Sequence, residues 1–176
     1  MKYKPHNYQQ FATDFILNQS ICCLMLDMGL GKTVITLTAL WQLALDSFDV
    51  SRVLVIAPKR VAEDTWPKEL MKWEHLTGLT SSLVLGSAAE RKAALQRKAF
   101  LYIINRENVA WLVKNHYWDF DMVVIDELSS FKSNKAERFK AMKKVRPMVT
   151  RIVGLTGTPA PNTLLDLWPQ MYLMDM

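Results

Sequence analysis

The sequence predicts an α/β domain in which a parallel sheet is covered by helices on both faces, giving three layers. Apolar runs alternate with helical patterns along all 176 residues, which is the order expected of repeated strand–helix units. The apolar runs lack a period of two, so both faces of the sheet are expected to be buried. The stretch Leu26–Thr33 joins an apolar run to a helical pattern through two glycines and Lys-Thr. This layout is typical of a phosphate-binding loop, or P-loop.

The predicted strands are short, apolar and bounded by polar residues or proline. Pro58 ends one of them, because proline cannot donate a ladder hydrogen bond. The only cysteines are Cys22 and Cys23. As neighbours in a strand they point to opposite faces, so we expect neither a disulfide nor a shared metal. The expected strands are Ile21–Leu26, Arg52–Ala57, Ser82–Leu85, Phe100–Ile104, Met122–Asp126 and Arg151–Leu155.

The predicted helices carry apolar residues at helical spacing. Asn7 is a candidate N-cap for the first helix, and Ser133 or Asn134 is a candidate for a charged helix later in the chain. Pro67 either interrupts the third helix or starts its second part. The expected helices are Tyr8–Asn18, Thr33–Leu45, Val61–Trp73, Ala88–Gln96, Glu107–Lys114, Lys135–Lys144 and Leu164–Leu173.

The composition describes one ordinary domain with a substantial core. Hydrophobic residues make up 50% of the chain, which argues against disorder. The apolar runs are far shorter than the roughly 20 residues that span a membrane, and no segment of signal type follows Met1–Pro5. We therefore expect a cytoplasmic protein without a membrane partner. The net charge of +5 is compatible with binding nucleic acid, and equally with a basic surface that only confers solubility.

Each residue type in the predicted P-loop has a chemical reason. Gly29 and Gly31 let backbone N–H groups approach a polyphosphate. Lys32 would place its ammonium between the outer phosphates, and the Thr33 hydroxyl would bind Mg²⁺. The helix that begins there directs its positive end toward the anion. Because the full GxxxxGK[ST] pattern has Gly at the position of Leu26, the alternative of a tight turn that merely carries Lys-Thr stays open on this stretch alone.

Polar residues suited to phosphate and metal chemistry follow the other predicted strands. In a parallel sheet the carboxyl ends of the strands meet at one edge, where ligands bind. After a continuous apolar strand, Asp126 would hold Mg²⁺ and Glu127 would polarise an attacking water as general base. The alternative is an exposed acidic turn. The remaining strand ends carry Lys59, Arg60, Arg106, Thr156, Gly157 and Thr158.

Three further segments allow two interpretations each. The hydroxyls of Thr156–Pro159 could sense a γ-phosphate, or the segment is an ordinary turn. The Gln9 amide suits the edge of an adenine and Tyr3 could stack on a base, or both belong to a capped surface helix. The basic run from Lys135 to Arg146 binds a polyanion or is a solvated helix face.

Taken in this order, the motifs resemble the first, N-terminal RecA-like ATPase lobe of superfamily 2 helicase-like proteins. The similarity is strongest to the Swi/Snf group of DNA translocases, in particular its phage and bacterial members. Asp27–Thr33 matches that group's DxGLGKT, and Gly154–Pro159 matches its motif III. Pro5–Gln9 is similar to the adenine-reading Q motif, and Thr65–Glu69 resembles the W-x-x-E segment. Asp126–Ser129 stands where the group has DEAH or a variant, with Leu-Ser in place of Ala-His.

The resemblance implies a DNA-dependent ATPase or translocase that binds ATP with Mg²⁺ and tracks duplex DNA without sequence preference. Lys32, Asp126 and Glu127 are then the catalytic residues, and Thr33 and Asp126 hold the metal. The implied nucleotide contacts are Tyr3, Gln9, Met28, Gly29, Leu30, Gly31, Lys32 and Thr33. The implied nucleic-acid contacts are Lys59, Arg60, Arg106, Thr156, Gly157 and Thr158.

Working ATPases of this family close on nucleotide between two RecA-like lobes, and the second lobe supplies an arginine finger. The resemblance places residues 1–176 in the first, ATP-binding lobe only, so a fragment or truncated gene product is expected. We expect this lobe alone to bind Mg-ATP weakly and to hydrolyse it poorly, since a missing finger costs about 10³- to 10⁵-fold in rate. The alternatives are a P-loop nucleotide switch and an interaction module, both without nucleic acid.

Overall fold

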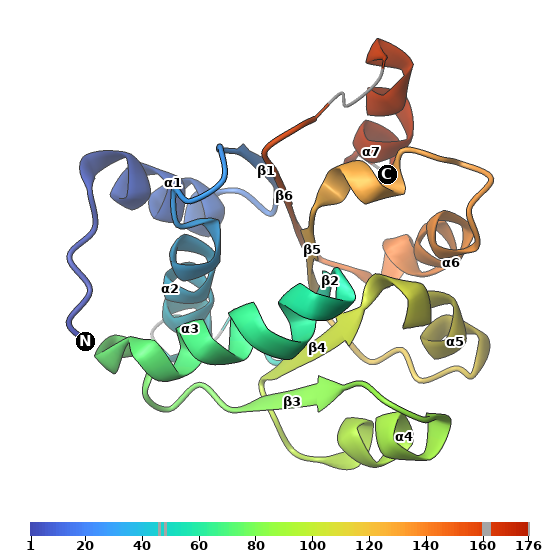
Figure 1. Ribbon diagram of the computed structural model, residues 1–176, viewed down its shortest axis with the longest axis horizontal. Helices are drawn as coiled ribbons and strands as arrows, with labels where there is room; N and C mark the ends of the chain where they lie inside the picture. The colour runs from blue at the N-terminus through green and yellow to red at the C-terminus, as the bar shows by residue number, and fades with distance from the viewer. Residues whose placement is uncertain (46, 48, 160–162, 176) are drawn as a thin grey trace.

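A parallel sheet of six strands runs through the computed structural model, which describes residues 1–45, 47, 49–159 and 163–175 (Figure 1). The spatial order is β1-β6-β5-β2-β4-β3, and every neighbouring pair is parallel. Each predicted strand is present within the described residues, with its ends shifted by at most one residue. The strands are β1 Ile21–Met25, β2 Val53–Ala57, β3 Ser81–Val84, β4 Leu101–Asn105, β5 Met122–Asp126 and β6 Arg151–Thr156.

The helices also follow the predicted order, with corrections at their ends. Helix α1 begins at Asn7 with His6 at the N-cap, so Asn7 lies inside the helix rather than capping it. Two predicted helices begin as 3₁₀ turns, η3 Arg106–Asn108 and η6 Leu164–Asp166. The α-helices are α1 Asn7–Asn18, α2 Lys32–Leu45, α3 Trp66–Lys72, α4 Ala88–Gln96, α5 Val109–Lys114, α6 Glu137–Val145 and α7 Leu167–Met174. The other short turns are η2 Glu74–Leu76, η4 Leu128–Phe131 and η5 Arg146–Met148.

The predicted helix from Val61 to Trp73 is divided at its proline. Residues Val61–Thr65 form a π-helical turn, η1, and α3 begins at Trp66 with Pro67 in its first turn. Proline cannot donate to the carbonyl four residues earlier, and its ring clashes with that carbonyl. The preceding turn is accordingly wider, because the Trp66 N–H donates to the carbonyl of Val61, five residues back. Pro67 therefore starts the second part of the helix.

The predicted caps of α6 are wrong. The helix begins at Glu137, and Ala136 is its N-cap without a side-chain hydrogen bond. Ser133 instead opens a turn that precedes the helix, in which the Ala136 N–H donates to the Ser133 carbonyl at 3.2 Å. Serine and asparagine are common in turns as well as at helix caps. Here Ser133 and Asn134 lie in the turn before the helix.

Two hydrophobic cores, one on each face of the sheet, confirm the three layers. In β2, Val53 and Val55 belong to the core beneath α1, α2 and α3, whereas Leu54 and Ile56 belong to the core beneath α4 to α7. Figure 1 shows α1 to α3 on one side of the strands and α5 to α7 on the other. The predicted α/β fold with a parallel sheet covered on both faces is therefore confirmed. Within the part of the chain described, no helix is long and apolar enough to cross a membrane.

The strand register brings the chemically useful loops together. Met25 at the end of β1 pairs with Thr156 at the end of β6, and Asp126 at the end of β5 pairs with Leu155. Because all the strands point the same way, the loops that follow β1, β6 and β5 leave the same edge of the sheet side by side.

Candidate functional site

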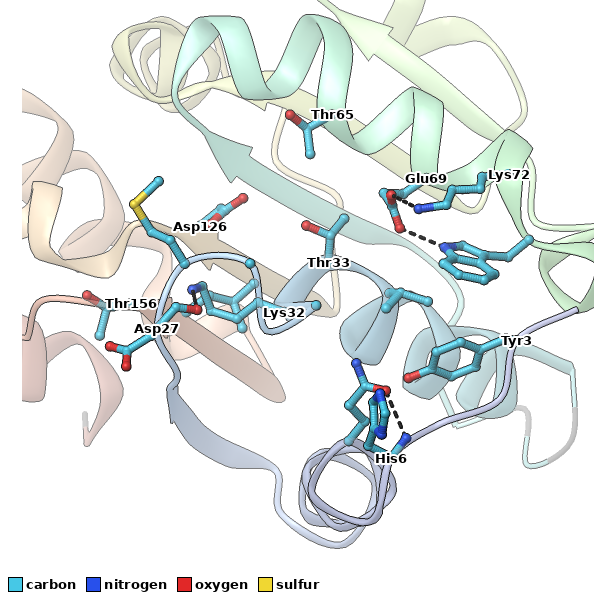
Figure 2. Close-up of a pocket in the computed structure, with 18 of the residues that line it drawn as sticks. Tyr3, His6, Asp27, Lys32, Thr33, Thr65, Glu69, Lys72, Asp126 and Thr156 are labelled. Atoms are coloured by element: carbon cyan, nitrogen blue, oxygen red, sulfur yellow. Dashed lines mark hydrogen bonds and ion pairs between the residues drawn. The ribbon is translucent and has the colours of Figure 1, made fainter. Parts of the chain in front are cut away.

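A cavity of about 940 Å³ lies at this edge of the sheet (Figure 2). Its walls are the glycine loop after β1, the segment before α1, the turn after β5, the loop after β6 and one side of α3. The predicted site residues that line it are Tyr3, Gln9, Met28, Gly29, Gly31, Lys32, Thr33, Asp126, Glu127, Thr156, Gly157 and Thr158.

The glycine loop has the backbone geometry that its residue types predict. Gly29 and Gly31 have φ angles of +83° and +82°, in the left-handed region that glycine adopts without strain. The Gly31 carbonyl accepts a hydrogen bond from the Ile35 N–H at 3.0 Å, which opens the first turn of α2. The free N–H groups at the start of this helix therefore face the loop, as an anion site requires.

The Lys32 ammonium folds back over its own loop. Nζ donates to the carbonyls of Leu26 at 2.7 Å and Asp27 at 3.0 Å. Figure 2 shows Lys32 beside Asp27, with Thr33 next along α2, and all three residues line the cavity. An ammonium has three donors, so these two bonds hold the charge at the loop and leave one donor for a ligand.

Gln9 connects the start of α1 to the glycine loop. Its Oε1 accepts from the His6 N–H at 3.0 Å, and its Nε2 donates to the Leu30 carbonyl at 3.3 Å. The Tyr8 hydroxyl donates to the same carbonyl at 3.2 Å. A Cβ at Gly31 would lie 2.7 Å from Gln9 Nε2. Gly31 is therefore needed both for its backbone angle and for the close approach of Gln9.

Asp126 is held by an indole. The Nε1–H of Trp66 donates to Asp126 Oδ2 at 2.9 Å. Burial raises the pKa of Asp126 above its usual value, while the Trp66 hydrogen bond and the charge of Lys32 oppose that rise. A partly buried carboxylate of this kind gains free energy from a nearby cation, which fits a metal-binding role.

Glu127 follows in an uncommon conformation. Its φ of 57° and ψ of 62° lie in the left-handed region, which non-glycine residues adopt mainly at turns and functional sites. Its Oε2 lies 3.4 Å from Nη1 of Arg106. Glu127 lines the cavity while its side chain is 57% exposed, so water can reach it.

The loop after β6 packs directly on the glycine loop. The Leu26 N–H donates to the Thr156 carbonyl at 3.1 Å. A Cβ at Gly157 would lie 3.3 Å from the Leu26 carbonyl oxygen. The Thr156 hydroxyl accepts from the Thr158 N–H at 3.1 Å, which closes a tight turn. The two loops are therefore in direct contact beside the cavity.

Four of the predicted residues lie outside the cavity wall. Lys59 and Arg60 are exposed after β2, where Lys59 pairs with Glu63 at 3.8 Å. Arg106 follows β4 at the same edge of the sheet, beside the cavity. The Leu30 side chain does not line the cavity, and its carbonyl instead anchors Gln9.

Tyr3 belongs to an aromatic cluster at the far end of the cavity. Its ring stacks on His75 with centroids 5.2 Å apart and meets the edge of Trp73 at 5.2 Å. Burial raises its pKa to about 12. Among the residues that the structure describes, its buried hydroxyl has no hydrogen-bond partner. One face of the ring is thus already covered by His75.

One wall of the cavity was missed by the sequence analysis. The residues on α3 and at its two ends that line it are Thr65, Glu69, Lys72 and Trp73. Glu69 accepts from Trp73 Nε1 at 2.6 Å and from Lys72 Nζ at 3.1 Å (Figure 2). Trp66, fully buried at the start of the same helix, reaches Asp126 from behind. The available signal was the Trp-x-x-Glu spacing around Pro67, which gives no indication of what either residue contacts.

The residues present fit a Mg²⁺-bound polyphosphate. Thr33 and Asp126 offer a hydroxyl and a carboxylate, the hard oxygen donors that Mg²⁺ prefers. In residues 1–45, 47, 49–159 and 163–175, no group of three or more His, Cys, Asp or Glu could form an all-protein metal cage. Mg²⁺ at nucleotide sites typically takes one or two protein ligands and completes its shell with phosphate oxygens and water, so this sparse donor set suits it.

The parallel sheet with a glycine loop at its carboxyl edge defines a RecA-like P-loop lobe. The same fold occurs in the Sulfolobus solfataricus SWI2/SNF2 ATPase core solved with dsDNA, at a TM-score of 0.81 and 24% identity over 99% of this chain and 36% of that one. The model of the SNF2-related domain family matches residues 8–175. The chain belongs to the SNF2-related domain family.

Curated relatives agree with this assignment. Protein p41 of Acyrthosiphon pisum secondary endosymbiont phage 1 is 39% identical over 181 residues, covering 98% of this chain and 39% of the phage protein. The DNA repair and recombination protein RAD54 of Oryza sativa subsp. japonica is 30% identical over 187 residues, covering 94% of this chain and 19% of its own length. The chain therefore spans well under half the length of these relatives.

Proposed function

We propose that this chain is the ATP-binding lobe of a DNA-dependent ATPase or translocase. The observation that carries the proposal is one cavity lined by the glycine loop, Lys32 and Thr33 together with Asp126 and Glu127. Membership of the SNF2-related domain family supports it. The carboxyl edge of a parallel sheet is also where such folds bind nucleotides.

In the proposed mechanism, each residue at the cavity has one task. The glycine loop and the start of α2 donate N–H groups to the phosphates, and the Lys32 ammonium balances their charge. Thr33 and Asp126 hold Mg²⁺, which when bound neutralises charge on the transferred phosphoryl group. Glu127 takes the proton of the attacking water. The side-chain amide of Gln9 hydrogen-bonds the edge of the adenine. Tyr3 forms part of the cavity wall beside the base.

We assign the cation opposite the phosphates to a second RecA-like lobe of the parent protein. Among the described residues that line the cavity there is no arginine, whereas phosphoryl transfer gains about 10³- to 10⁵-fold from an arginine finger. The matched relatives are more than twice as long as this chain, which leaves room for such a lobe. On this proposal the chain alone binds Mg-ATP weakly and hydrolyses it poorly.

The proposed DNA contacts are phosphate contacts at the ends of β2, β4 and β6. Lys59, Arg60 and Arg106 supply cations there, and the exposed Thr158 supplies a hydroxyl. Thr156 is buried, with 2% exposure, and its hydroxyl holds the turn that presents Gly157 and Thr158. Such contacts carry little sequence information, which suits duplex tracking. The Sulfolobus neighbour was solved with dsDNA, and the phage relative favours the cytoplasm of a bacterial or phage-infected cell as the place of action.

Nucleotide binding by Lys32→Ala tests the proposal against an interaction module that needs no nucleotide. Removing a charge-assisted contact of about 1.5 to 3 kcal/mol should weaken Mg-ATP binding by roughly tenfold or more in calorimetry. Lys98→Ala, which removes an exposed cation before β4 at the opposite edge of the sheet, should leave the affinity unchanged. Equal affinities for all three proteins, or no binding by the wild type, would refute the nucleotide site.

A further inference from the structure

The indole of Trp66 touches the proposed catalytic centre from the interior of the protein. Its side chain is completely buried, with 0% exposure. Its one polar atom, Nε1, donates to Asp126 Oδ2 at 2.9 Å. The two residues are 60 positions apart in the chain, so the contact is made by tertiary structure alone.

The π-helical turn sets the direction of this indole. In η1 the Trp66 N–H bonds to Val61, five residues back, so one extra residue is accommodated just before α3. An inserted residue rotates all following side chains by about 100° around the helix axis. Pro67 fixes the position of that turn. With regular α-helical winding through this segment, Trp66 would face a different direction and could not meet the end of β5.

The hydrogen bond leaves Asp126 a single useful orientation. Because Oδ2 is engaged by the indole, the carboxylate of Asp126 is restricted in its rotation where it lines the cavity. An indole N–H donates only and carries no charge. It therefore orients the carboxylate without neutralising it, whereas a lysine or arginine in that place would compete with a metal cation.

We propose that Trp66 is a positioning residue for the Mg²⁺ ligand Asp126, in addition to being part of the hydrophobic core. This inference rests on the proposed function, because it assumes that Asp126 holds the metal. Groups that orient a metal ligand from behind typically contribute 10- to 100-fold to metal affinity. The alternative is that Trp66 only fills space in the hydrophobic core between α3 and the sheet.

Trp66→Phe separates the two roles, because it keeps an aromatic ring and removes the N–H. Calorimetric titration of ADP, with and without Mg²⁺, gives the contribution of the metal. We expect the Mg²⁺ concentration for half-maximal effect to rise about tenfold, with ADP affinity in the absence of Mg²⁺ changed less than twofold. An unchanged Mg²⁺ requirement, or equal losses with and without Mg²⁺, would overturn the proposal.

Trp118→Phe is the matched control. Within the described residues, the buried Nε1 of Trp118 has no hydrogen-bond partner, so the same substitution there should leave the Mg²⁺ requirement unchanged. In an Asp126→Asn background, Trp66→Phe should add nothing further, because the two residues act as one unit. Additive effects would count against the proposal. Failure of the wild type to bind ADP at all would instead refute the nucleotide site itself.

A measurement that leaves Trp66 intact covers the case in which the variant does not fold. In the wild type labelled with ¹⁵N-tryptophan, the indole N–H signal of Trp66 should shift when Mg²⁺ is added to the ADP complex. The Trp118 signal should stay in place. A Trp66 signal that ignores Mg²⁺ while ADP binding responds to it would overturn the positioning role.

Discussion

The guanidinium of Arg106 lies 3.4 Å from the carboxylate of Glu127, although β4 and β5, which these residues follow, are separated by β2. The same guanidinium donates from Nε to Glu107 at 3.0 Å. One side chain thus joins the proposed general base to the strand ends where DNA phosphates are proposed to lie. A phosphate that draws Arg106 toward itself would weaken its pairing with Glu127.

Replacing Arg106 should weaken DNA binding through lost electrostatics. Arg106→Gln removes one cation from the edge of the sheet, so affinity for duplex DNA should fall for every sequence alike, and the slope of log affinity against log salt should decrease by about 1. Anisotropy of a labelled duplex at several salt concentrations measures both. Lys98→Gln, an exposed cation at the opposite edge of the sheet, should leave the slope as in the wild type. An unaltered slope in Arg106→Gln would exclude Arg106 as a phosphate contact.

Local patterns were enough to predict most of the fold. Met122–Asp126 and Ala88–Gln96 have the predicted bounds. The second is fixed by a local capping box, in which Ser87 Oγ accepts from the Glu90 N–H and Glu90 accepts from the Ser87 N–H. The rule that ligands bind at the carboxyl ends of parallel strands placed Lys32 and Asp126 in one cavity, because it needs only the alternation of strands and helices along the chain.

Contacts between distant residues could not be predicted in this way. A buried tryptophan in a helix looks the same to pattern analysis whether or not its N–H meets Asp126, 60 residues away. The strand-end rule identifies the edge of the sheet but not where that edge is hollow, so Lys59 and Arg60 were grouped with residues whose cavity they do not line. The cause in both cases is packing geometry, which depends on the whole chain.

The two loop glycines should differ in their tolerance of alanine. Both have φ near +82°, so each substitution carries about 1–2 kcal/mol of left-handed strain. At Gly31 the new Cβ would also lie 2.7 Å from Gln9 Nε2, whereas nothing lies within 4 Å at Gly29. Displacing Gln9 breaks two hydrogen bonds worth about 1 kcal/mol each. Urea unfolding should therefore show a loss in Gly31→Ala larger by about 1–2 kcal/mol than in Gly29→Ala.

Gln9→Ala provides the internal check on that comparison. With the amide removed, the extra cost of Gly31→Ala over Gly29→Ala should shrink, because the clash partner is gone. A difference that persists in full would mean that Gln9 is not its cause.

Acid should destabilise the aromatic cluster through His75. Burial lowers the pKa of His75 below its ordinary 6.5, and its Nε2 lies 2.9 Å from the Thr38 hydroxyl. The unfolded chain therefore binds a proton more readily, and the free energy of unfolding should fall as pH drops below about 6.5. His75→Phe keeps a ring that can stack on Tyr3 but cannot titrate, so its stability should depend less on pH between about 7 and 5.

Urea midpoints followed by circular dichroism across that pH range measure the effect. His116→Asn, which removes an exposed histidine at a left-handed position that asparagine tolerates, should keep the wild-type slope. The same slope in His75→Phe and the wild type would show that the half-buried imidazole does not govern acid sensitivity.

Arg146 should govern the attachment of α7. Its guanidinium is buried, with 4% exposure, and donates to the carbonyls of Leu173 at 2.7 Å, Met174 at 2.9 Å and Val149 at 3.0 Å. Arg146→Met keeps apolar volume but leaves these carbonyls without their donor, at about 1–3 kcal/mol for each buried group. We expect a loss of about 3 kcal/mol or more in urea unfolding, and faster hydrogen exchange at the amides of α7. Arg97→Met, at an exposed position, should cost less than about 0.5 kcal/mol. The α7 amides of Arg146→Met could instead exchange as slowly as those of the wild type. In that case α7 would be held by apolar contacts, such as that of Tyr172 with Phe139, and not by the buried guanidinium.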